Sequence, residues 1–318
     1  MRVLLLLAAA ATAAAQNRVT EGDLKLIDAP PGAAGEGPSW DPAGFLYFVG
    51  NNKLSRLDTQ GKVEAFLDPS PGANGSLVDP QGRIVVCESQ ARRVIRIGRD
   101  RSITVLAAGY QGKRFNSPND LAIDSKGRIY FTDPRYGRRD GMEILDAQGK
   151  TVEGVYRIDA PGQITRILEH EVDRPNGILV APGDAHLFVA DNNNDAGGVR
   201  KLWRFDLRKD GTVDPATRKL IFDWHTARGP DGFKMDREGR LYVAAGLNRP
   251  SRSETTDEFK GGVFVISPTG QLLEFVAVPK DEVTNCAFGG ADLKTLYITA
   301  GGSLFSIRTR TAGLITAR

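Results

Sequence analysis

The sequence predicts an all-β fold, a six-bladed β-propeller with four antiparallel strands in each blade. The first observation is a pattern repeated six times: a polar residue, a short apolar run, a turn resembling D-x-x-G, and an apolar strand. The copies begin at positions 36, 74, 119, 176, 231 and 285, so they are spaced by 38 to 57 residues. A period of roughly 40–50 residues with several short strands is typical of propeller blades. The second observation is that no helical pattern of useful length interrupts the repeats.

The strands of each blade follow in order. The first blade is predicted to contain strands at 45–49, 53–57 and 63–67, and the second at 84–87, 94–97 and 103–106. These runs are rich in β-branched and aromatic residues and are bounded by Gly, Asp, Asn and Pro. A short strand after each polar residue completes the four. The sixth blade has runs at 286–288, 296–298 and 304–307 but lacks an outer strand. We expect residues 24–27 to supply it, which closes the ring and removes an exposed edge.

A propeller is a single ring, so residues 16–318 are predicted to form one domain. The 42 basic and 39 acidic residues are dispersed and give a net charge of +3, which argues against a nucleic-acid-binding surface. Cys87 and Cys286 lie in different blades and are expected to be buried free thiols.

Residues 1–15 are predicted to be a signal peptide. A basic start and an apolar run precede three alanines at 13–15, the small residues that a signal peptidase requires. The run is shorter than the ~20 residues that span a bilayer. We therefore expect a periplasmic or secreted protein that has no membrane association after cleavage.

The six polar residues that open the repeats, which we call the anchors, are predicted to meet on one face of the ring. The innermost strand of each blade begins there, and the loop between the second and third strands returns to the same face. Carboxylate and amide oxygens are the ligands that hard divalent cations prefer. Asn-Gly and Asp-Gly pairs are also ordinary turn formers, and this is the competing explanation. The anchors are Glu36, Asn74, Asn119, Asn176, Asp231 and Asn285.

The chain resembles the senescence-marker-protein/gluconolactonase/luciferin-regenerating-enzyme-like family of six-bladed propellers. The resemblance rests on EGPSW at 36–40, RFNSPNDLAID at 114–124, YFTDPRYG at 130–137, RPNGI at 174–178, GPDGFKMD at 229–236 and TNCAFGGADLKTLYITA at 284–300. It implies that Glu36, Asn176 and Asp231 bind one divalent metal. It also implies that Asn119 contacts substrate or completes the metal shell. The implied activities are lactone hydrolysis and, in a related branch, organophosphate hydrolysis.

These observations together predict a metal-dependent hydrolase that opens a sugar-type lactone. The metal would polarise the carbonyl. Ca²⁺ is the favoured metal, with Mg²⁺, Mn²⁺ or Zn²⁺ as alternatives. Asp231 or metal-bound water would act as base or nucleophile. Asn74, Asn119 and Asn285 are predicted to bind substrate. Arg135, where the family loop usually reads TDPPYG, is a further substrate-binding candidate and is equally well explained as a solvated side chain.

Other functions stay open on the sequence alone. The chain could be a non-catalytic propeller that binds a ligand and holds a structural Ca²⁺, or a hydrolase of other lactones or of organophosphate esters. The absence of a G-x-S-x-G motif disfavours a serine hydrolase.

Overall fold

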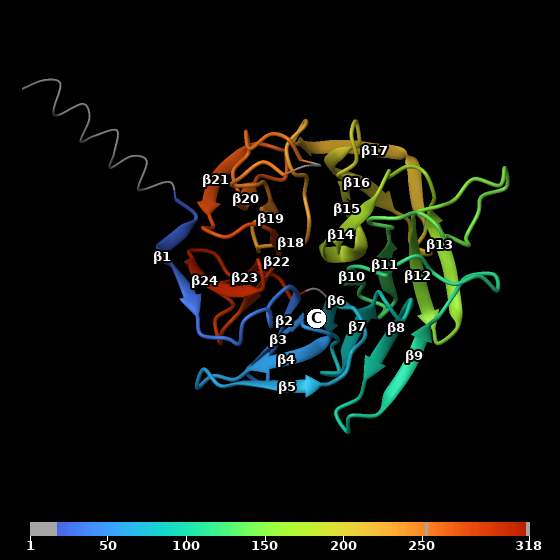
Figure 1. The fold of residues 1–318 in the computed structure, drawn as a ribbon. Coiled ribbons are helices and arrows are strands. Elements are labelled where there is room, and N and C mark those ends of the chain that lie inside the picture. The colour runs from blue at the N-terminus through green and yellow to red at the C-terminus, as the bar shows by residue number, and fades with distance from the viewer. Residues whose placement is uncertain (1–17, 252–253, 316–318) are drawn as a thin grey trace, which may run out of the picture.

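The computed structural model describes residues 18–251 and 254–315, which form a six-bladed β-propeller (Figure 1). Each blade is a four-stranded antiparallel sheet, as predicted. The predicted signal peptide lies outside the described residues. Among the described residues, helical structure is limited to a 3₁₀ turn at Pro182–Asp184.

The first three blades each consist of four strands consecutive in the chain. The first contains β2 (Glu36–Asp41), β3 (Phe45–Gly50), β4 (Lys53–Leu57) and β5 (Val63–Leu67). The second contains β6 (Ala73–Val78), β7 (Ile84–Glu88), β8 (Arg93–Ile97) and β9 (Ile103–Ala107). The third contains β10 (Leu121–Ile123), β11 (Ile129–Asp133), β12 (Gly154–Ala160) and β13 (Gln163–Leu168).

The last three blades complete the ring. The fourth contains β14 (Pro175–Val180), β15 (His186–Asn192), β16 (Arg200–Leu207) and β17 (Val213–Asp223). The fifth contains β18 (Phe233–Met235), β19 (Leu241–Ala245), β20 (Gly262–Ile266) and β21 (Leu272–Ala277). The sixth contains β22 (Val283–Gly289), β23 (Thr295–Ala300), β24 (Ser303–Thr309) and the N-terminal β1 (Thr20–Ile27), which pairs with β24 as expected.

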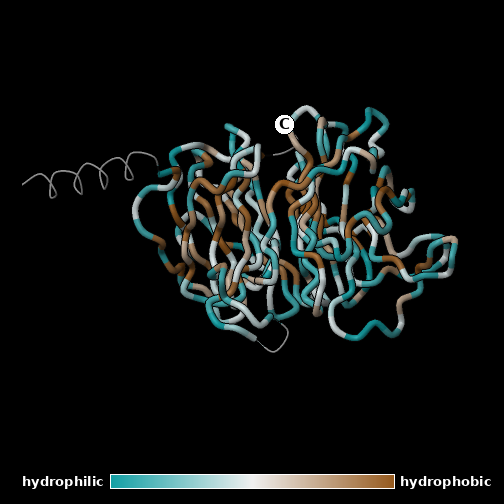
Figure 2. Tube along the Cα trace, turned by 90° about the horizontal axis from the view of Figure 1, so that it is seen from above, coloured by the Kyte–Doolittle hydropathy of each residue, from teal (hydrophilic) through white to brown (hydrophobic). Residues whose placement is uncertain are grey.

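The hydrophobic core lies between neighbouring blades. Alternate residues of the second and third strands face the next sheet, so each main cluster joins two blades. Figure 2 shows this arrangement, with hydrophobic segments through the middle of the ring and hydrophilic loops at its edges. Cys87 and Cys286 are both buried free thiols, as expected from the sequence.

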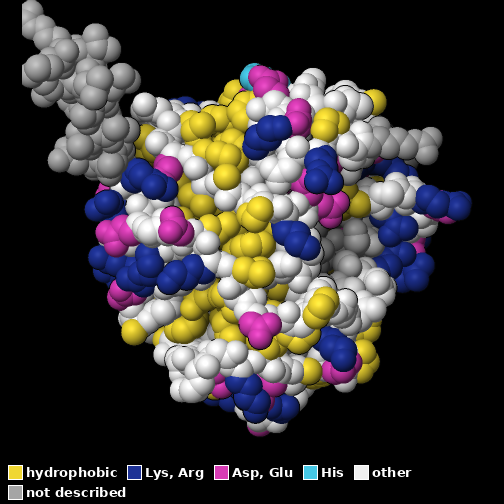
Figure 3. Space-filling model, turned by 60° about the vertical axis from the view of Figure 1, so that its left-hand side comes forward, with side chains coloured by type: hydrophobic (Ala, Val, Ile, Leu, Met, Phe, Trp, Pro, Cys, Tyr) yellow, Lys and Arg dark blue, Asp and Glu magenta, His cyan; other side chains and the backbone are white. Residues whose placement is uncertain are grey.

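The outer side of the ring carries patches of hydrophobic side chains separated by charged ones (Figure 3). Exposed members such as Leu26, Ile103 and Leu272 lie on outermost strands. No helix in the described part of the chain has the length and apolar character needed to cross a bilayer.

Candidate functional site

The anchors lie where the ladder between the first two strands of each blade is interrupted. In four blades the pairing shifts register at the anchor, as between Glu36 and Ser39 or between Pro175 and Ile178. In the third and fifth blades the innermost strand begins only after the anchor, at Leu121 and Phe233. Such irregularities turn side chains away from the sheet and are frequent beside functional sites.

Glycines after several anchors allow the neighbouring blade to approach the axis closely. A Cβ atom at Gly177 would lie 2.2 Å from the carbonyl oxygen of Asp231, and one at Gly232 would lie 1.9 Å from Cγ of Asn285. Any larger residue would force these blades apart. The anchor-glycine pairs therefore bring the anchors of successive blades together at the axis.

Glu36 is oriented by an anchor from the last blade. Its Oε2 accepts hydrogen bonds from its neighbour Gly37 N at 2.6 Å and from Asn285 Nδ2 at 3.0 Å. The same Nδ2 lies 3.4 Å from Oδ2 of Asp120, a buried carboxylate. Burial, followed by the charges of Asp231 and Asp120, raises the pKa of Glu36 well above its usual value. Three carboxylates from different blades thus share one electrostatic environment.

Asp231 is held by an arginine. Its Oδ2 accepts a hydrogen bond from Arg228 Nη2 at 3.0 Å, and Arg228 Nη1 lies 3.6 Å from Oε2 of Glu254. All three side chains are buried. Burial raises the pKa of Asp231 to about 7, although Arg228 opposes this shift and the Asn176 amide opposes it more weakly. Asp120 adds to the increase in pKa.

Several anchor amides have oxygens without partners. Asn176 donates a hydrogen bond from Nδ2 to the Tyr136 hydroxyl at 2.7 Å, while its Oδ1 is buried and accepts none. The Oδ1 atoms of Asn74 and Asn119 are likewise buried without a partner. Buried polar atoms are normally satisfied, so unpartnered oxygens indicate a place for a cation or a ligand donor. Within the described ranges, no three His, Cys, Asp or Glu side chains form a metal-holding group, so any cation here would need amide ligands as well.

Asn285 and Arg135 are engaged within the protein. Besides donating to Glu36, Asn285 accepts through Oδ1 from the backbone N of Cys286 at 2.9 Å and lies 3.5 Å from Nζ of Lys234. Arg135 donates from Nε to the carbonyl of Arg138 within its own loop at 2.8 Å.

Sequence reasoning missed five side chains of this site. Asp120 directly follows an anchor, and Lys234 follows another by three residues. Tyr136 and Glu254 come from the long loops after β11 and β19. Arg228 precedes the fifth anchor. The motif SPND contained the signal for Asp120, and Arg228 lies only three residues before Asp231, whereas the other three depend on contacts between distant segments. The missed residues are Asp120, Tyr136, Arg228, Lys234 and Glu254.

The C-terminal segment closes the central channel at the end opposite the anchors. Leu314 N donates to the carbonyl of Met235 at 2.9 Å, and Gly313 N donates to that of Leu293 at 2.8 Å. Leu314 and Ile315 line a cavity of about 60 Å³ together with Lys234. Figure 1 places this end of the chain over the middle of the ring.

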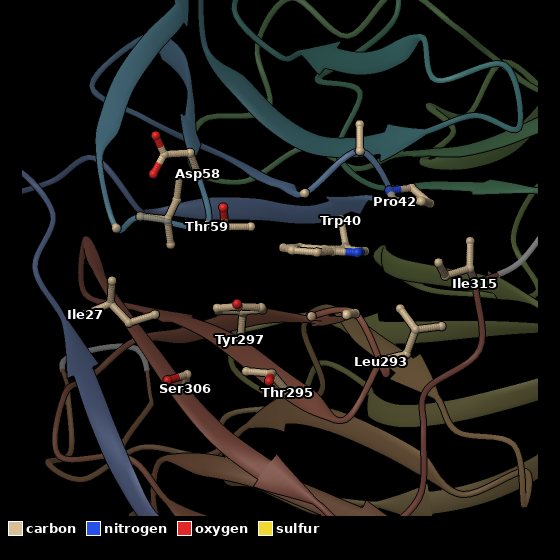
Figure 4. A pocket seen from close by; sticks show the side chains of 16 residues that line it. Ile27, Trp40, Pro42, Asp58, Thr59, Leu293, Thr295, Tyr297, Ser306 and Ile315 are labelled. Atoms are coloured by element: carbon tan, nitrogen blue, oxygen red, sulfur yellow. The ribbon is translucent and has the colours of Figure 1, made fainter.

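A larger cavity of about 560 Å³ lies between the first and sixth blades, away from the anchors. Trp40 and Tyr297 form its opposing walls, with ring centroids 6.1 Å apart and ring planes inclined by 11° (Figure 4). Two of its polar side chains have partners: Asp58 accepts from the backbone of its own turn, and Thr295 accepts from Arg308. No buried carboxylate pair or unpartnered amide is found among its lining residues, so the reactive groups are those of the anchor ring.

Fold and site together define a six-bladed propeller with a buried ring of carboxylates and amides around its axis. The family follows from comparison of the whole chain with known proteins. Residues 34–302 match the model described as "SMP-30/Gluconolactonase/LRE-like region", and the chain belongs to this family.

Two relatives and a fold neighbour illustrate the family. A gluconolactonase of Zymomonas mobilis is 31% identical over 303 residues, covering 87% of this chain and 79% of the relative. The structure of a Xanthomonas campestris gluconolactonase superposes with a TM-score of 0.73 at 29% identity, covering 92% of this chain and 91% of the other. A calcium-binding regucalcin of Agrobacterium tumefaciens shares the fold, with a TM-score of 0.70 at 18% identity and coverage of 94% and 97%.

Proposed function

We propose that this protein is a lactonase that opens a sugar-type lactone and requires one divalent cation, for which Ca²⁺ is the favoured candidate. The observation that carries the proposal is the grouping of half-buried Glu36 with buried Asp231 and Asn176, whose amide oxygen has no partner. The gluconolactonase relatives support the substrate class.

The chemistry of the site fits a divalent cation. Four buried or half-buried carboxylates, Glu36, Asp120, Asp231 and Glu254, are accompanied by two basic groups, Arg228 and Lys234. The group has two surplus negative charges when fully ionised, which one divalent cation would neutralise. Burial is the main cause of the raised pKa values of Glu36 and Asp231, and neighbouring carboxylates add to both increases. Glu36, Asn176 and Asp231 would hold the ion, with Asn119 at the edge of its shell.

In the proposed reaction, water adds to the lactone carbonyl and the bond between the carbonyl carbon and the ring oxygen breaks. A bound divalent cation would polarise the carbonyl and stabilise negative charge on its oxygen. Asp231 takes the proton of the attacking water on its carboxylate, and Arg228 fixes the orientation of that carboxylate. The protonated Asp231 then gives this proton to the ring oxygen, which leaves as a hydroxyl, so the product is a hydroxy acid. The unpartnered oxygens of Asn74 and Asn119 accept hydrogen bonds from substrate hydroxyls.

The test is hydrolysis of aldonolactones, aryl lactones and acyl-homoserine lactones by chelator-treated protein, before and after addition of Ca²⁺, Mg²⁺, Mn²⁺ or Zn²⁺. We expect turnover of an aldonolactone that disappears with chelator and returns with cation. Asp231→Asn should lower kcat/KM by at least ~100-fold, because general-base catalysis typically contributes 10²–10⁴-fold. Asp292→Asn, at an exposed ion pair with Arg308, is the matched control and should retain full activity.

Two results would contradict the proposal. Full activity of Asp231→Asn would show that Asp231 is not the base. Turnover that is insensitive to chelator would show that no cation is required. No turnover of any lactone, together with a cation-dependent melting temperature, would instead favour a ligand-binding propeller with a structural ion.

We also propose that residues 1–15 direct export and are removed. The support is the basic start, apolar run and alanines of the sequence. Mass spectrometry of the protein from its native cells should find a mature chain beginning at Gln16. An intact Met1 on the accumulated protein would contradict export by this route.

A further inference from the structure

We infer that Tyr136 is a positioning residue that fixes the amide of Asn176 with its oxygen available to the cation. This inference rests on the proposed cation site. It concerns whether Oδ1 or Nδ2 of Asn176 faces the cation site. Neither the family match nor the set of proposed ligands determines this orientation.

The direction of the hydrogen bond follows from the surroundings of the Tyr136 hydroxyl. The hydroxyl has one proton, and the carbonyl oxygen of Asn192 lies 3.3 Å away as its acceptor. With its proton directed there, the hydroxyl oxygen is left to accept, and the group facing it at 2.7 Å is Nδ2 of Asn176. Turning the amide over would place two oxygens against each other. The hydroxyl therefore selects one of the two amide orientations.

The consequence lies on the opposite side of the amide. Asn176 is only 3% exposed, and its Oδ1 accepts no hydrogen bond from the protein. Nδ2 is held by the Tyr136 hydroxyl, so Oδ1 is the amide atom left for a cation.

The surroundings of Tyr136 keep the hydroxyl in place. The guanidinium of Arg174 lies over the tyrosine ring, 5.3 Å from its centroid. Arg174 is itself buried and held by Glu153 at 3.2 Å and Asp195 at 2.8 Å. Arg174 and its two ion pairs therefore restrict the movement of the loop that carries Tyr136. Residues that orient metal ligands typically change cation affinity by 10–100-fold when they are replaced.

The experiment measures Ca²⁺ binding to chelator-treated protein by titration calorimetry, with CaCl₂ as the probe. We expect Tyr136→Phe to weaken Ca²⁺ binding by about tenfold, because the amide loses the acceptor that fixes it. Tyr130→Phe is the matched control. The Tyr130 hydroxyl contacts Asp124 at 3.1 Å and the Gly211 carbonyl at 3.2 Å, in the same blade as Tyr136 but at the other end of β11. Its loss should reduce the melting temperature and leave Ca²⁺ affinity within about twofold.

A second background separates orientation from general disruption. In Asn176→Asp both side-chain termini are oxygens, so there is no orientation left to select. We expect Tyr136→Phe to change Ca²⁺ affinity by less than about twofold in that background. Equal losses in both backgrounds would overturn the inference, as would unchanged affinity of Tyr136→Phe alone. Failure of the wild-type protein to bind any divalent cation would instead contradict the proposed function, so the two failures are distinguishable.

Discussion

At the scale of single residues, the repeated turns that the sequence predicts are held by local hydrogen bonds. The turn aspartate accepts backbone hydrogen bonds from residues two and four positions later and pairs with the arginine at the fourth position. For Asp79 and Arg83 the Oδ2–Nε distance is 2.6 Å. Asp124 and Asp236 repeat the arrangement with Arg128 and Arg240. All of these atoms lie within five residues of each other.

The buried aspartates at the ends of the second strands could not be predicted in this way. Asp133 accepts hydrogen bonds from the backbone N of Asn116 and Ser117, each at 2.8 Å. Asp191 does the same for Asp173 and Arg174 in the next blade. Their partners lie just before the inner strand of the same blade, 16 to 18 residues earlier in the chain, so only the folded blade shows the role.

Asp133 gives the protein a defined pH dependence of stability. Burial raises its pKa to about 7, so the folded state binds more protons than the unfolded state between about pH 4 and pH 7. The contribution of this carboxyl to stability is therefore greatest at low pH and falls as pH rises through that window. We expect the free energy of unfolding of Asp133→Asn to be lower than that of wild type at about pH 5. This difference should become smaller as the pH increases to about 8.

Urea unfolding of chelator-treated protein across that pH range measures the difference. Asp292→Asn is the control, because Arg308 lowers the pKa of Asp292 to about 2 and its titration ends below this range. The difference between that variant and wild type should stay flat from about pH 5 to pH 8. A flat difference for Asp133→Asn as well would show that the Asp133 pKa is not raised.

At the scale of elements, the predicted strands of blades one and two are found within one residue, whereas β22 and β1 of the sixth blade begin three and four residues earlier than predicted. Alternating apolar residues and turn residues determine them, and these features are continuous in the sequence. The closing strand was also predictable, because an edge without a partner requires one. Its attachment to the fifth blade was not. Glu274 of β21 accepts from the backbone of Val19 at 2.6 Å and of Thr20 at 3.1 Å, more than 250 residues away.

The candidate site, like the strands, was predictable where local patterns determine it and not where contacts between distant segments do. The repeat predicted six anchors on one face, and in the structure half-buried Glu36 interacts electrostatically with buried Asp231, which in turn interacts with buried Asn176. The repeat could not show the register shifts that turn the anchors toward the axis. It also could not indicate which side of each amide faces the centre. Those orientations are set by loops, and loop conformation depends on contacts that no periodic pattern encodes.

At the scale of the whole molecule, the two ends of the channel have separate roles. The anchor end carries the charged groups, and the far end is closed by the C-terminal segment. Ala312 accepts through its carbonyl from Arg237 N at 3.0 Å, and Leu314 packs against the core of blades four and five. A Cβ at Gly313 would lie 2.0 Å from the Phe288 ring, so the segment fits closely over the sixth blade. This segment joins blades five and six across the axis.

Removal of residues 312–318 should therefore lower stability while leaving cation binding intact. The truncated protein loses three backbone hydrogen bonds and the burial of Leu314. Burying a leucine contributes roughly 1.5–3 kcal/mol, so a decrease of several degrees in melting temperature is expected. The anchors make none of these contacts, so Ca²⁺ affinity measured by calorimetry should stay within about twofold of wild type. Removal of residues 316–318 alone is the control that isolates the contribution of residues 312–315. If the longer truncation abolished Ca²⁺ binding without changing the melting temperature, the two ends of the channel would be coupled and the separation argued here would be wrong.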